Sequence, residues 1–234
     1  MKTATPKTPR RRQSAGLIAR AGFTLVEILA VILIIGILST FVIPQVSSAI
    51  RLGKSTACQA NLGAIQRGFL EYQAKYQKVP KGSGVQFFAS LITTTVWKPT
   101  VKNSKTLTCP AVELGFLTPG QDELPIEDWF RPVNQDVIDG GYSSYAGRNQ
   151  KRHPLRNMNG DGDKALVADD NDPEGNHETT TNVLWDDLSV RALELVDIQN
   201  EGLLSAEGDV RYIPVGPDSP VEGLQVLTLS LIHI

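Results

Sequence analysis

Residues 23–43 form an apolar run of 21 residues without lysine or arginine, and a single carboxylate, Glu27, lies inside it. As an α-helix the run would be about 31 Å long, which is enough to cross the hydrocarbon core of a membrane. A charged side chain on such a helix costs roughly 2.5–3.5 kcal/mol on insertion scales, so it normally has a partner. The run therefore predicts a transmembrane helix, and its acid requires an explanation.

The 22 residues before the run contain no acid and six basic residues: Lys2, Lys7, Arg10, Arg11, Arg12 and Arg20. This asymmetry predicts that the N-terminus stays in the cytoplasm and that the rest of the chain crosses the membrane. A cleaved secretory signal would have a shorter apolar core followed by a small-residue cleavage site. Twin-arginine export is a second alternative, but orientation alone explains the arginines. A plain membrane anchor explains the length and the charge, but not Glu27.

Cleavage between Gly22 and Phe23 would give Glu27 a partner. The new α-amino group would be a cation at the membrane face, and Glu27 lies only about 6 Å deeper along the helix axis. Glu27 could then pair with the amino group of a neighbouring chain when the helices pack side by side. Such pairing would offset the cost of burying the acid, and a mismatched register would leave it unpaired.

The segment Gly22-Phe23-Thr24-Leu25-Val26-Glu27 and the apolar run resemble the N-terminal signature of type IV pilins and type II secretion pseudopilins. The resemblance implies that a prepilin peptidase cuts after Gly22 and methylates Phe23, and that Glu27 is the assembly carboxylate. Pro44 matches the helix-kinking proline of many pilins. Implied partners are the prepilin peptidase, other pilin or pseudopilin subunits and an inner-membrane assembly platform. The implied location is the inner membrane, single-pass, with the head in the periplasm or outside the cell.

The leader holds six of the 23 basic residues, so the mature chain keeps 17 against 25 acidic residues. This excess of acid argues against general nucleic-acid binding, which needs a basic surface. We expect four parts: a leader at 1–22, a transmembrane helix at 23–43, a soluble continuation of the helix at 44–79 and a globular head at 80–234.

Helical signals continue beyond Pro44. An apolar stripe with spacings of three and four residues predicts one buried helix face: Cys58, Leu62, Ile65, Phe69, Tyr72 and Tyr76. Glutamines and Lys75 mark the opposite face, and the pattern ends at 79–82. The helix is thus predicted from Phe23 to about Lys78, disturbed at Pro44. Small residues such as Ala49, Gly53 and Gly68 either allow close helix approach in a filament or simply favour the helix.

Cys58 and Cys109 both follow the membrane run, on the side where disulfides persist. Cys58 is the first residue of the buried stripe, so it faces the head. Cys109 lies in the first part of the head. A bridge closing about 50 residues would stabilise the fold by a few kcal/mol. We expect this disulfide, with two buried free thiols as the alternative.

The sequence pattern of the head predicts an α+β fold, in which the long N-terminal helix packs on a small antiparallel β-sheet, as in pilins. A short helix is expected at 87–92. The chain from there to about residue 160 is expected to form mostly loops, with Trp97 and Trp129 as packing anchors. Strands are expected at 165–168, 181–185, 189–195 and 209–215. His177, followed by nine residues and Asp187, resembles a pilin-like group with a His-x9-Asp-Gly signature. Leu188 stands at the glycine position, where a tight turn would need positive φ.

Residues 157–172 include many Asp and Asn side chains, whose oxygens are potential metal ligands. Asp161, Asp163, Asp169 and Asp170 are candidate ligands for calcium, and the resemblance to pseudopilins allows an acidic calcium loop. The alternative is a solvated turn region. His153, His177 and His233 lack metal-ligand spacing, and His177 is expected to make a structural hydrogen bond near the hairpin. No catalytic arrangement emerges, so we expect that the chain is not an enzyme.

The final apolar residues, 229–234, resemble translated adapter DNA; the alternative is an edge strand beginning near Leu224. The expected function is a structural subunit of a type II secretion pseudopilus. A minor pilin of a type IV pilus, used in adhesion, motility or DNA uptake, is the alternative within the class. A membrane-anchored binding domain that never polymerises is the alternative from another class.

Overall fold

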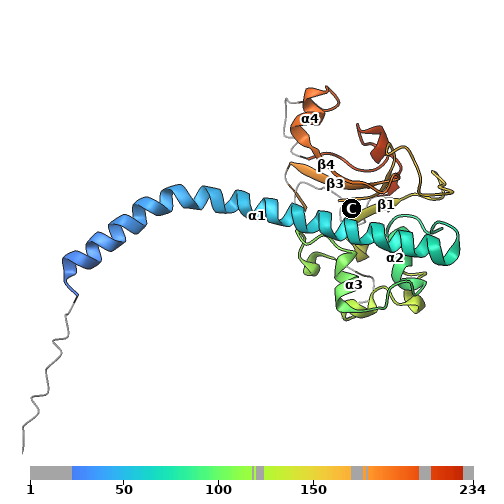
Figure 1. Cartoon of the computed structure of the whole chain (residues 1–234), viewed down its shortest axis with the longest axis horizontal. Coiled ribbons are helices and arrows are strands. Elements are labelled where there is room, and N and C mark those ends of the chain that lie inside the picture. The colour runs from blue at the N-terminus through green and yellow to red at the C-terminus, as the bar shows by residue number, and fades with distance from the viewer. Residues whose placement is uncertain are drawn as a thin grey trace, which may run out of the picture. The chain divides into compact units, whose positions relative to one another are not determined.

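The fold is described from a computed structural model, which covers residues 23–117, 119, 124–169, 176–177, 179–205 and 212–228, without the side chain of Pro44. The chain divides into two compact units, Met1–Val46 and Ser47–Ile234, and each is described by itself. The described part of the first unit is helical, and the second unit is the head together with the helix segment packed on it (Figure 1).

Helix α1, Leu25–Tyr76, confirms the long helix predicted from residues 23 to 78. It ends where Gln77 takes a left-handed conformation with φ of 54°, a common way to stop a helix, and Pro80 follows soon after. Pro44 lies inside α1, and a kink at this residue stays a prediction.

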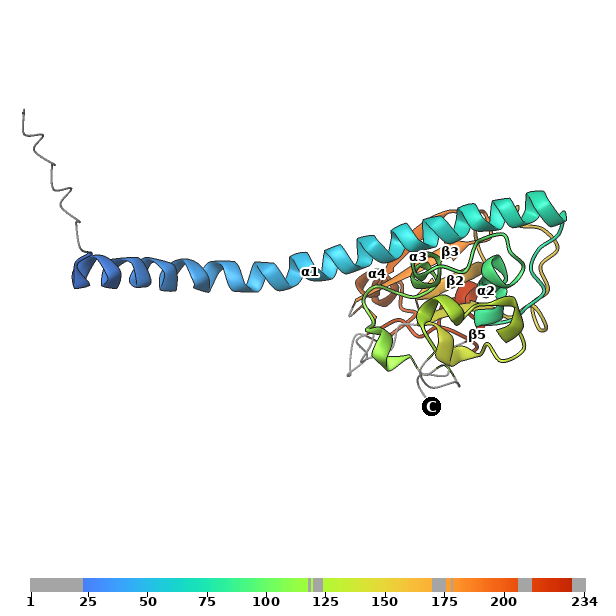
Figure 2. The same cartoon turned by 90° about the horizontal axis from the view of Figure 1, so that it is seen from below.

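The predicted stripe on α1 is the core of the head. Cys58, Leu62, Ile65 and Phe69 have no exposed surface and Tyr72 is 5% exposed, while Tyr76 packs partly buried at the edge of the same cluster. Figure 2 shows this part of α1 lying along the head. The 3.6-residue period thus correctly identified the face that packs on the head.

Neither close helix approach in a filament nor helix propensity explains Gly68, because it faces the head. A Cβ built on Gly68 would lie 2.6 Å from the Trp97 ring and 2.7 Å from Leu91. Gly68 is therefore small because the head packs directly against it, whereas a Cβ on Gly53 would meet nothing within 4 Å.

Short helices form the first part of the head. Helix α2, Val85–Thr93, confirms the helix expected at 87–92 and is buried along almost its whole length. Helix α3, Val101–Thr106, was not predicted because its sequence is polar; the Thr100 hydroxyl caps it by accepting a hydrogen bond from the Asn103 N–H. Four short 3₁₀ turns follow, at Leu114–Phe116, Ile126–Asp128, Pro132–Asn134 and Gly140–Tyr142. Trp129 is 6% exposed, as expected of a packing anchor, and Trp97 is partly buried.

An antiparallel five-stranded sheet in the order β4-β3-β2-β1-β5 completes the α+β fold. Its strands are β1 Tyr145–Arg148, β2 Ala165–Asp169, β3 Thr180–Trp185, β4 Val190–Glu194 and β5 Leu227–Thr228. Strands β2, β3 and β4 confirm three predictions, although β4 gives way to helix α4, Leu195–Asn200. Strand β1 was missed within a region predicted as loops. Strand β5 agrees with the alternative of an edge strand beginning near Leu224, and residues 229–234, which resemble translated adapter DNA, lie outside the described residues.

The strand predicted at 209–215 is wrong for its described part. Tyr212–Val215 has no strand conformation, and residues 209–211 lie outside the described residues. Pro214 cannot donate a ladder hydrogen bond. Ile213 and Val215 are buried all the same, in a second core cluster with Leu224 and Val226.

The sheet is covered on both faces. Tyr145, Val167 and Leu184 belong to the cluster formed with α1 and α2, whereas Ala146, Ala168 and Val183 belong to the second cluster. Because side chains alternate along a strand, Asp169, which pairs with Tyr145, points to the α1 side. This alternation brings polar residues of three strands under α1.

The β3–β4 hairpin tolerates leucine where the turn needs positive φ. Leu188 has φ of 63°, its N–H donates to the Trp185 carbonyl at 2.9 Å, and the Trp185 N–H donates to the Ser189 carbonyl at 2.9 Å. The Asp187 carboxylate accepts from the Ser189 N–H and hydroxyl at 2.9 and 2.7 Å. The turn geometry is therefore kept without glycine.

We expect Leu188→Gly to be more stable than Leu188→Ala by about 1 kcal/mol, because both lose the side chain but only alanine resists the left-handed conformation. Elsewhere glycine is normally the less stable of this pair. Thermal unfolding of the two variants in detergent measures the difference. An alanine variant as stable as the glycine variant would show that the turn is not strained.

Candidate functional site

The apolar half of α1 is exposed along its length. Leu25–Ile43 is long and apolar enough to cross a membrane, judged by length and composition, and none of its residues is buried against the described part of the chain. Phe23 is 80% exposed, and large apolar side chains such as Leu33 and Phe41 are more than half exposed. Lipid or other protein must cover this surface, as expected for the predicted membrane segment.

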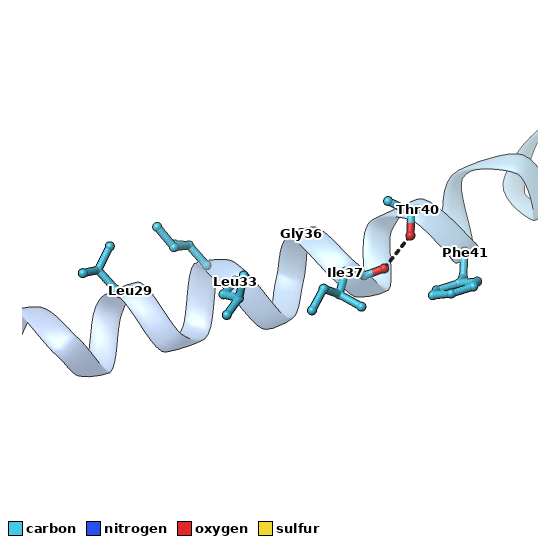
Figure 3. A pocket seen from close by; sticks show the side chains of 7 residues that line it. Leu29, Leu33, Gly36, Ile37, Thr40 and Phe41 are labelled. Carbon is cyan, nitrogen blue, oxygen red and sulfur yellow. Dashed lines mark hydrogen bonds between the residues drawn. The ribbon is translucent and has the colours of Figure 1, made fainter.

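One face of this segment is hollowed at Gly36. Figure 3 shows the lining residues, with the Thr40 hydroxyl turned back to donate to the Ile37 carbonyl at 2.7 Å; the lining consists of Leu29, Ile32, Leu33, Gly36, Ile37, Thr40 and Phe41. Because the Thr40 hydroxyl is satisfied within its own helix, the hollow is apolar. It suits close packing of another apolar helix.

Glu27 closes a reciprocal cap at the start of α1. Its carboxylate accepts hydrogen bonds from the Thr24 N–H at 2.8 Å and the Thr24 hydroxyl at 2.9 Å, and its own N–H donates to the Thr24 hydroxyl at 3.3 Å. This is a capping box, which the spacing Thr24-x-x-Glu27 could have revealed in the sequence. Gly22 lies outside the described residues, so the predicted cleavage site is described only on the Phe23 side.

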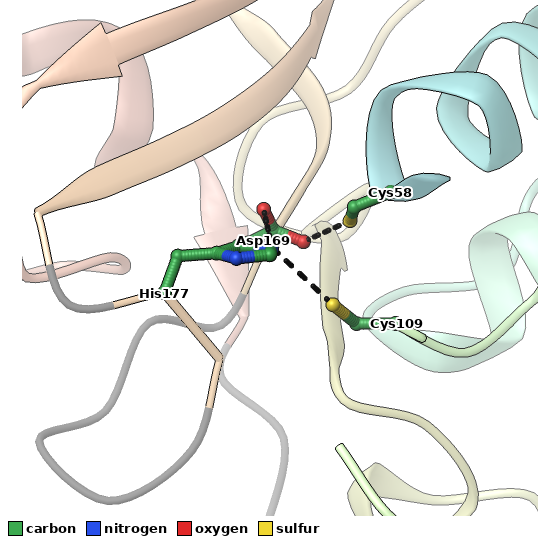
Figure 4. Close-up of side chains that lie close together, drawn as sticks. All are labelled: Cys58, Cys109, Asp169 and His177. Carbon is green, nitrogen blue, oxygen red and sulfur yellow. Dashed lines mark hydrogen bonds and ion pairs between the residues drawn. The ribbon is translucent and has the colours of Figure 1, made fainter. Parts of the chain in front are cut away.

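A cluster of four chemically reactive side chains lies between α1 and the sheet. Cys58 comes from α1, Cys109 from the loop after α3, Asp169 from the end of β2 and His177 from the segment before β3 (Figure 4). Their sulfur, oxygen and nitrogen atoms all lie within 4.8 Å of one another, and Cys58 and Asp169 have no exposed surface. The sequence predicted that Cys58 and Cys109 meet, but not that Asp169 and His177 join them.

Short contacts join the four side chains. The Cys58 thiol donates to Asp169 Oδ1 at 2.6 Å. The Cys109 sulfur lies 3.5 Å from His177 Nε2, and the same nitrogen lies 3.4 Å from Asp169 Oδ2. The structural hydrogen bond expected of His177, just before the hairpin strand β3, is therefore made to Cys109 in the core.

Asn182 holds the Asp169 carboxylate in place. Its backbone N–H and side-chain amide donate to Asp169 Oδ2 at 3.1 and 2.7 Å. Its own Oδ1 accepts from Gln59 at 2.8 Å and from Ser55 at 3.3 Å, both on α1. Gln59, expected on the exposed face of the helix, thus contacts the sheet. The carboxylate is oriented by groups from both sides of the interface.

The environment shifts the pKa values of the two thiols in opposite directions. Burial raises the pKa of Cys58, and Asp169 and Cys109 reinforce that shift. The hydrogen bond with Cys58 lowers the pKa of Cys109 against the effect of burial, with His177 contributing in the same direction. Burial raises the pKa of Asp169. Burial lowers the pKa of His177, but Cys109 and Asp169 more than offset this and its net shift is upward. Cys109 is therefore the thiol that ionises first, beside the histidine.

The predicted disulfide partners lie in the same cluster, but they are two free, buried thiols in the structure. The proximity agrees with the prediction, and the bond itself stays a prediction.

The four candidate calcium ligands are not brought together. Asp161 and Asp163 are exposed before β2, whereas Asp169 is buried at the far end of that strand. Six residues of extended chain separate Asp163 from Asp169 by about 20 Å. Asp170 lies outside the described residues. One ion cannot contact both ends of β2, so Asp161 and Asp163 cannot share a calcium ion with Asp169.

The comparisons with known proteins bear on the N-terminus. Residues 18–43 match the family model described as the prokaryotic N-terminal methylation motif. No match was found among curated proteins or among solved structures. The matched segment includes Phe23 and Glu27 and covers the apolar half of α1 to Ile43. The motif implies processing by a prepilin peptidase and assembly with other pilin subunits. The chain thus carries the N-terminal signature of type IV pilins and pseudopilins, at the start of a chain with an α+β fold.

Proposed function

We propose that the chain is a structural subunit of a type II secretion pseudopilus, anchored in the inner membrane and assembled through α1 after cleavage behind Gly22. The observation that carries the proposal is the methylation motif at residues 18–43, with Glu27 as the fifth residue of the mature chain. In this proposal the head is a structural part of the filament and catalyses no reaction. Cargo export by such a filament is mechanical.

Assembly through α1 is supported by its unsatisfied surface. None of the apolar side chains of Leu25–Ile43 is buried against the residues that the structure describes, and the hollow at Gly36 is open. Lateral packing of identical helices would cover this surface. It would also bring the amino group of one chain near Glu27 of the next, since the two lie only about 6 Å apart along the axis.

The basic leader supports the orientation. Six lysines and arginines precede the span and no acid balances them, which supports a cytoplasmic leader and a head across the inner membrane. The acid-rich mature chain does not suit general nucleic-acid binding.

Deleting the gene tests the proposal. We expect the culture medium to lose proteins exported by type II secretion while surface fibres persist, because a pseudopilus acts within the secretion apparatus. Restoring the gene on a plasmid should restore export. Loss of surface fibres with normal export would instead identify a minor pilin, and no change in either would favour an anchored binding domain.

A further inference from the structure

We propose that Cys58, Cys109, Asp169 and His177 bind one zinc ion, as a closed structural site between α1 and the sheet. The proposal is independent of the type of filament to which the chain belongs. It rests on the chemistry of the four donors, on their distances and on the groups around them.

The donor set suits zinc. The two soft thiolates and the borderline imidazole select zinc over magnesium or calcium, and zinc also accepts a carboxylate oxygen. Each comes from a separate segment, and together they offer four donor atoms within 4.8 Å. Zinc in structural sites takes four protein ligands in a tetrahedron.

The distances are close to those of a tetrahedral site. With zinc–sulfur bonds of about 2.3 Å and zinc–nitrogen bonds of about 2.0–2.1 Å, neighbouring ligand atoms lie about 3.3–3.8 Å apart. His177 Nε2 lies 3.5 Å from the Cys109 sulfur, within this range, and the four donor atoms all lie within 4.8 Å of one another. The Cys58–Asp169 contact, at 2.6 Å, is a thiol hydrogen bond that must open by about 1 Å when the ion replaces the proton.

The surrounding groups complete the site. Asn182 donates two hydrogen bonds to Asp169 Oδ2, which leaves Oδ1, the oxygen facing Cys58, as the metal ligand. The Tyr145 hydroxyl lies 3.2 Å from the Cys58 sulfur and can donate to the thiolate. Outer partners of this kind orient ligands in metal sites and raise metal affinity.

Zinc satisfies the cluster better than a disulfide does. Joining the two sulfurs removes the thiol proton that Asp169 Oδ1 accepts, and it leaves a buried carboxylate oxygen without its donor. Zinc replaces both thiol protons and bonds to that oxygen. It also gives the buried carboxylate a positive partner, which a fully enclosed acid normally needs.

All four ligands come from the protein and the site is enclosed, so it is structural and not catalytic. The ion would tie the middle of α1 to three segments of the head. Metal binding of this kind contributes directly to folding free energy. The head would therefore be locked to the helix through which the subunit assembles.

The test uses the full-length protein purified from membranes in detergent and kept reduced. We expect one zinc ion per chain by elemental analysis after exposure to zinc sulfate and removal of loosely bound metal. Cys109→Ser and His177→Ala should lower zinc affinity by more than the about 10–100-fold that follows loss of an outer partner. His153→Ala is the matched control, because His153 lies outside the cluster, and it should keep the ion.

Two measurements on the unmodified protein guard against variants that fail to fold. Cobalt, a spectroscopic substitute for zinc, should give the visible bands of a tetrahedral thiolate site, and removal of zinc by a chelator should lower the thermal midpoint. A reduced protein that takes up neither zinc nor cobalt would overturn the proposal. So would protein that is metal-free as isolated, lighter by two hydrogens in its intact mass and unable to bind zinc after reduction.

Discussion

Replacing Glu27 with glutamine is expected to abolish incorporation of the chain into filaments while leaving α1 and membrane insertion intact. Glutamine can still accept the hydrogen bonds that Thr24 donates to the Glu27 carboxylate, since a capping box accepts either residue. It cannot neutralise the amino group of a neighbouring chain. An unpaired charge on a membrane helix costs at most roughly 2.5–3.5 kcal/mol, the value at the membrane centre, and a loss approaching this size weakens association by about 100-fold.

Sheared filament fractions and membrane fractions, probed for the chain, measure this result. Glu71→Gln is the control, because it removes an exposed carboxylate from the same helix beyond the membrane segment and should assemble normally. Normal incorporation of Glu27→Gln would mean that Glu27 serves only to cap the helix. The plain anchor hypothesis would then gain support.

Replacing Gly147 with alanine is expected to destabilise the head by about 3 kcal/mol, at the upper end of the usual cost of overpacking. A Cβ on Gly147 would lie 2.0 Å from the backbone oxygen of Gly84. That oxygen accepts the Phe87 N–H at 3.0 Å, and the Gly84 N–H donates to the Arg148 carbonyl at 3.0 Å. The added methyl group thus meets backbone that is hydrogen-bonded on both sides and cannot rotate away.

Thermal unfolding of the head, followed by near-ultraviolet circular dichroism in detergent, measures the loss. Gly115→Ala provides the control, since a Cβ there meets nothing within 4 Å, and its midpoint should stay within experimental error of the original. A Gly147→Ala protein with an unchanged midpoint would mean that α2 can shift away from β1 without cost.

Elements with a strong local period were predictable. The buried stripe from Cys58 to Tyr72 repeats every three or four residues and lies in the core, and the short helix at 87–92 and strands β2 and β3 also follow from their apolar residues. Strand β1 was missed because Tyr145–Arg148 is short and contains Ala146 and Gly147, which carry little β signal. It becomes a strand because β2 and β5 pair with it on either side.

The segment 212–215 shows the opposite error. Its alternating apolar residues predicted a strand, and Ile213 and Val215 are indeed buried. Burial, however, is also available to irregular chain that packs on a sheet. The pattern identified the buried side chains correctly and their backbone conformation wrongly.

The amino-acid sequence by itself determined the membrane segment, the position of Glu27 and the face of α1 that packs on the head, because each depends on residues within a few turns of one helix. The tertiary structure decided that Cys58, Cys109, Asp169 and His177 meet. They are up to 119 positions apart in the sequence, and no local spacing relates them. Their meeting depends on the pairing of β1 with β2 and on how the sheet packs against α1, which are long-range choices made by the folded chain as a whole.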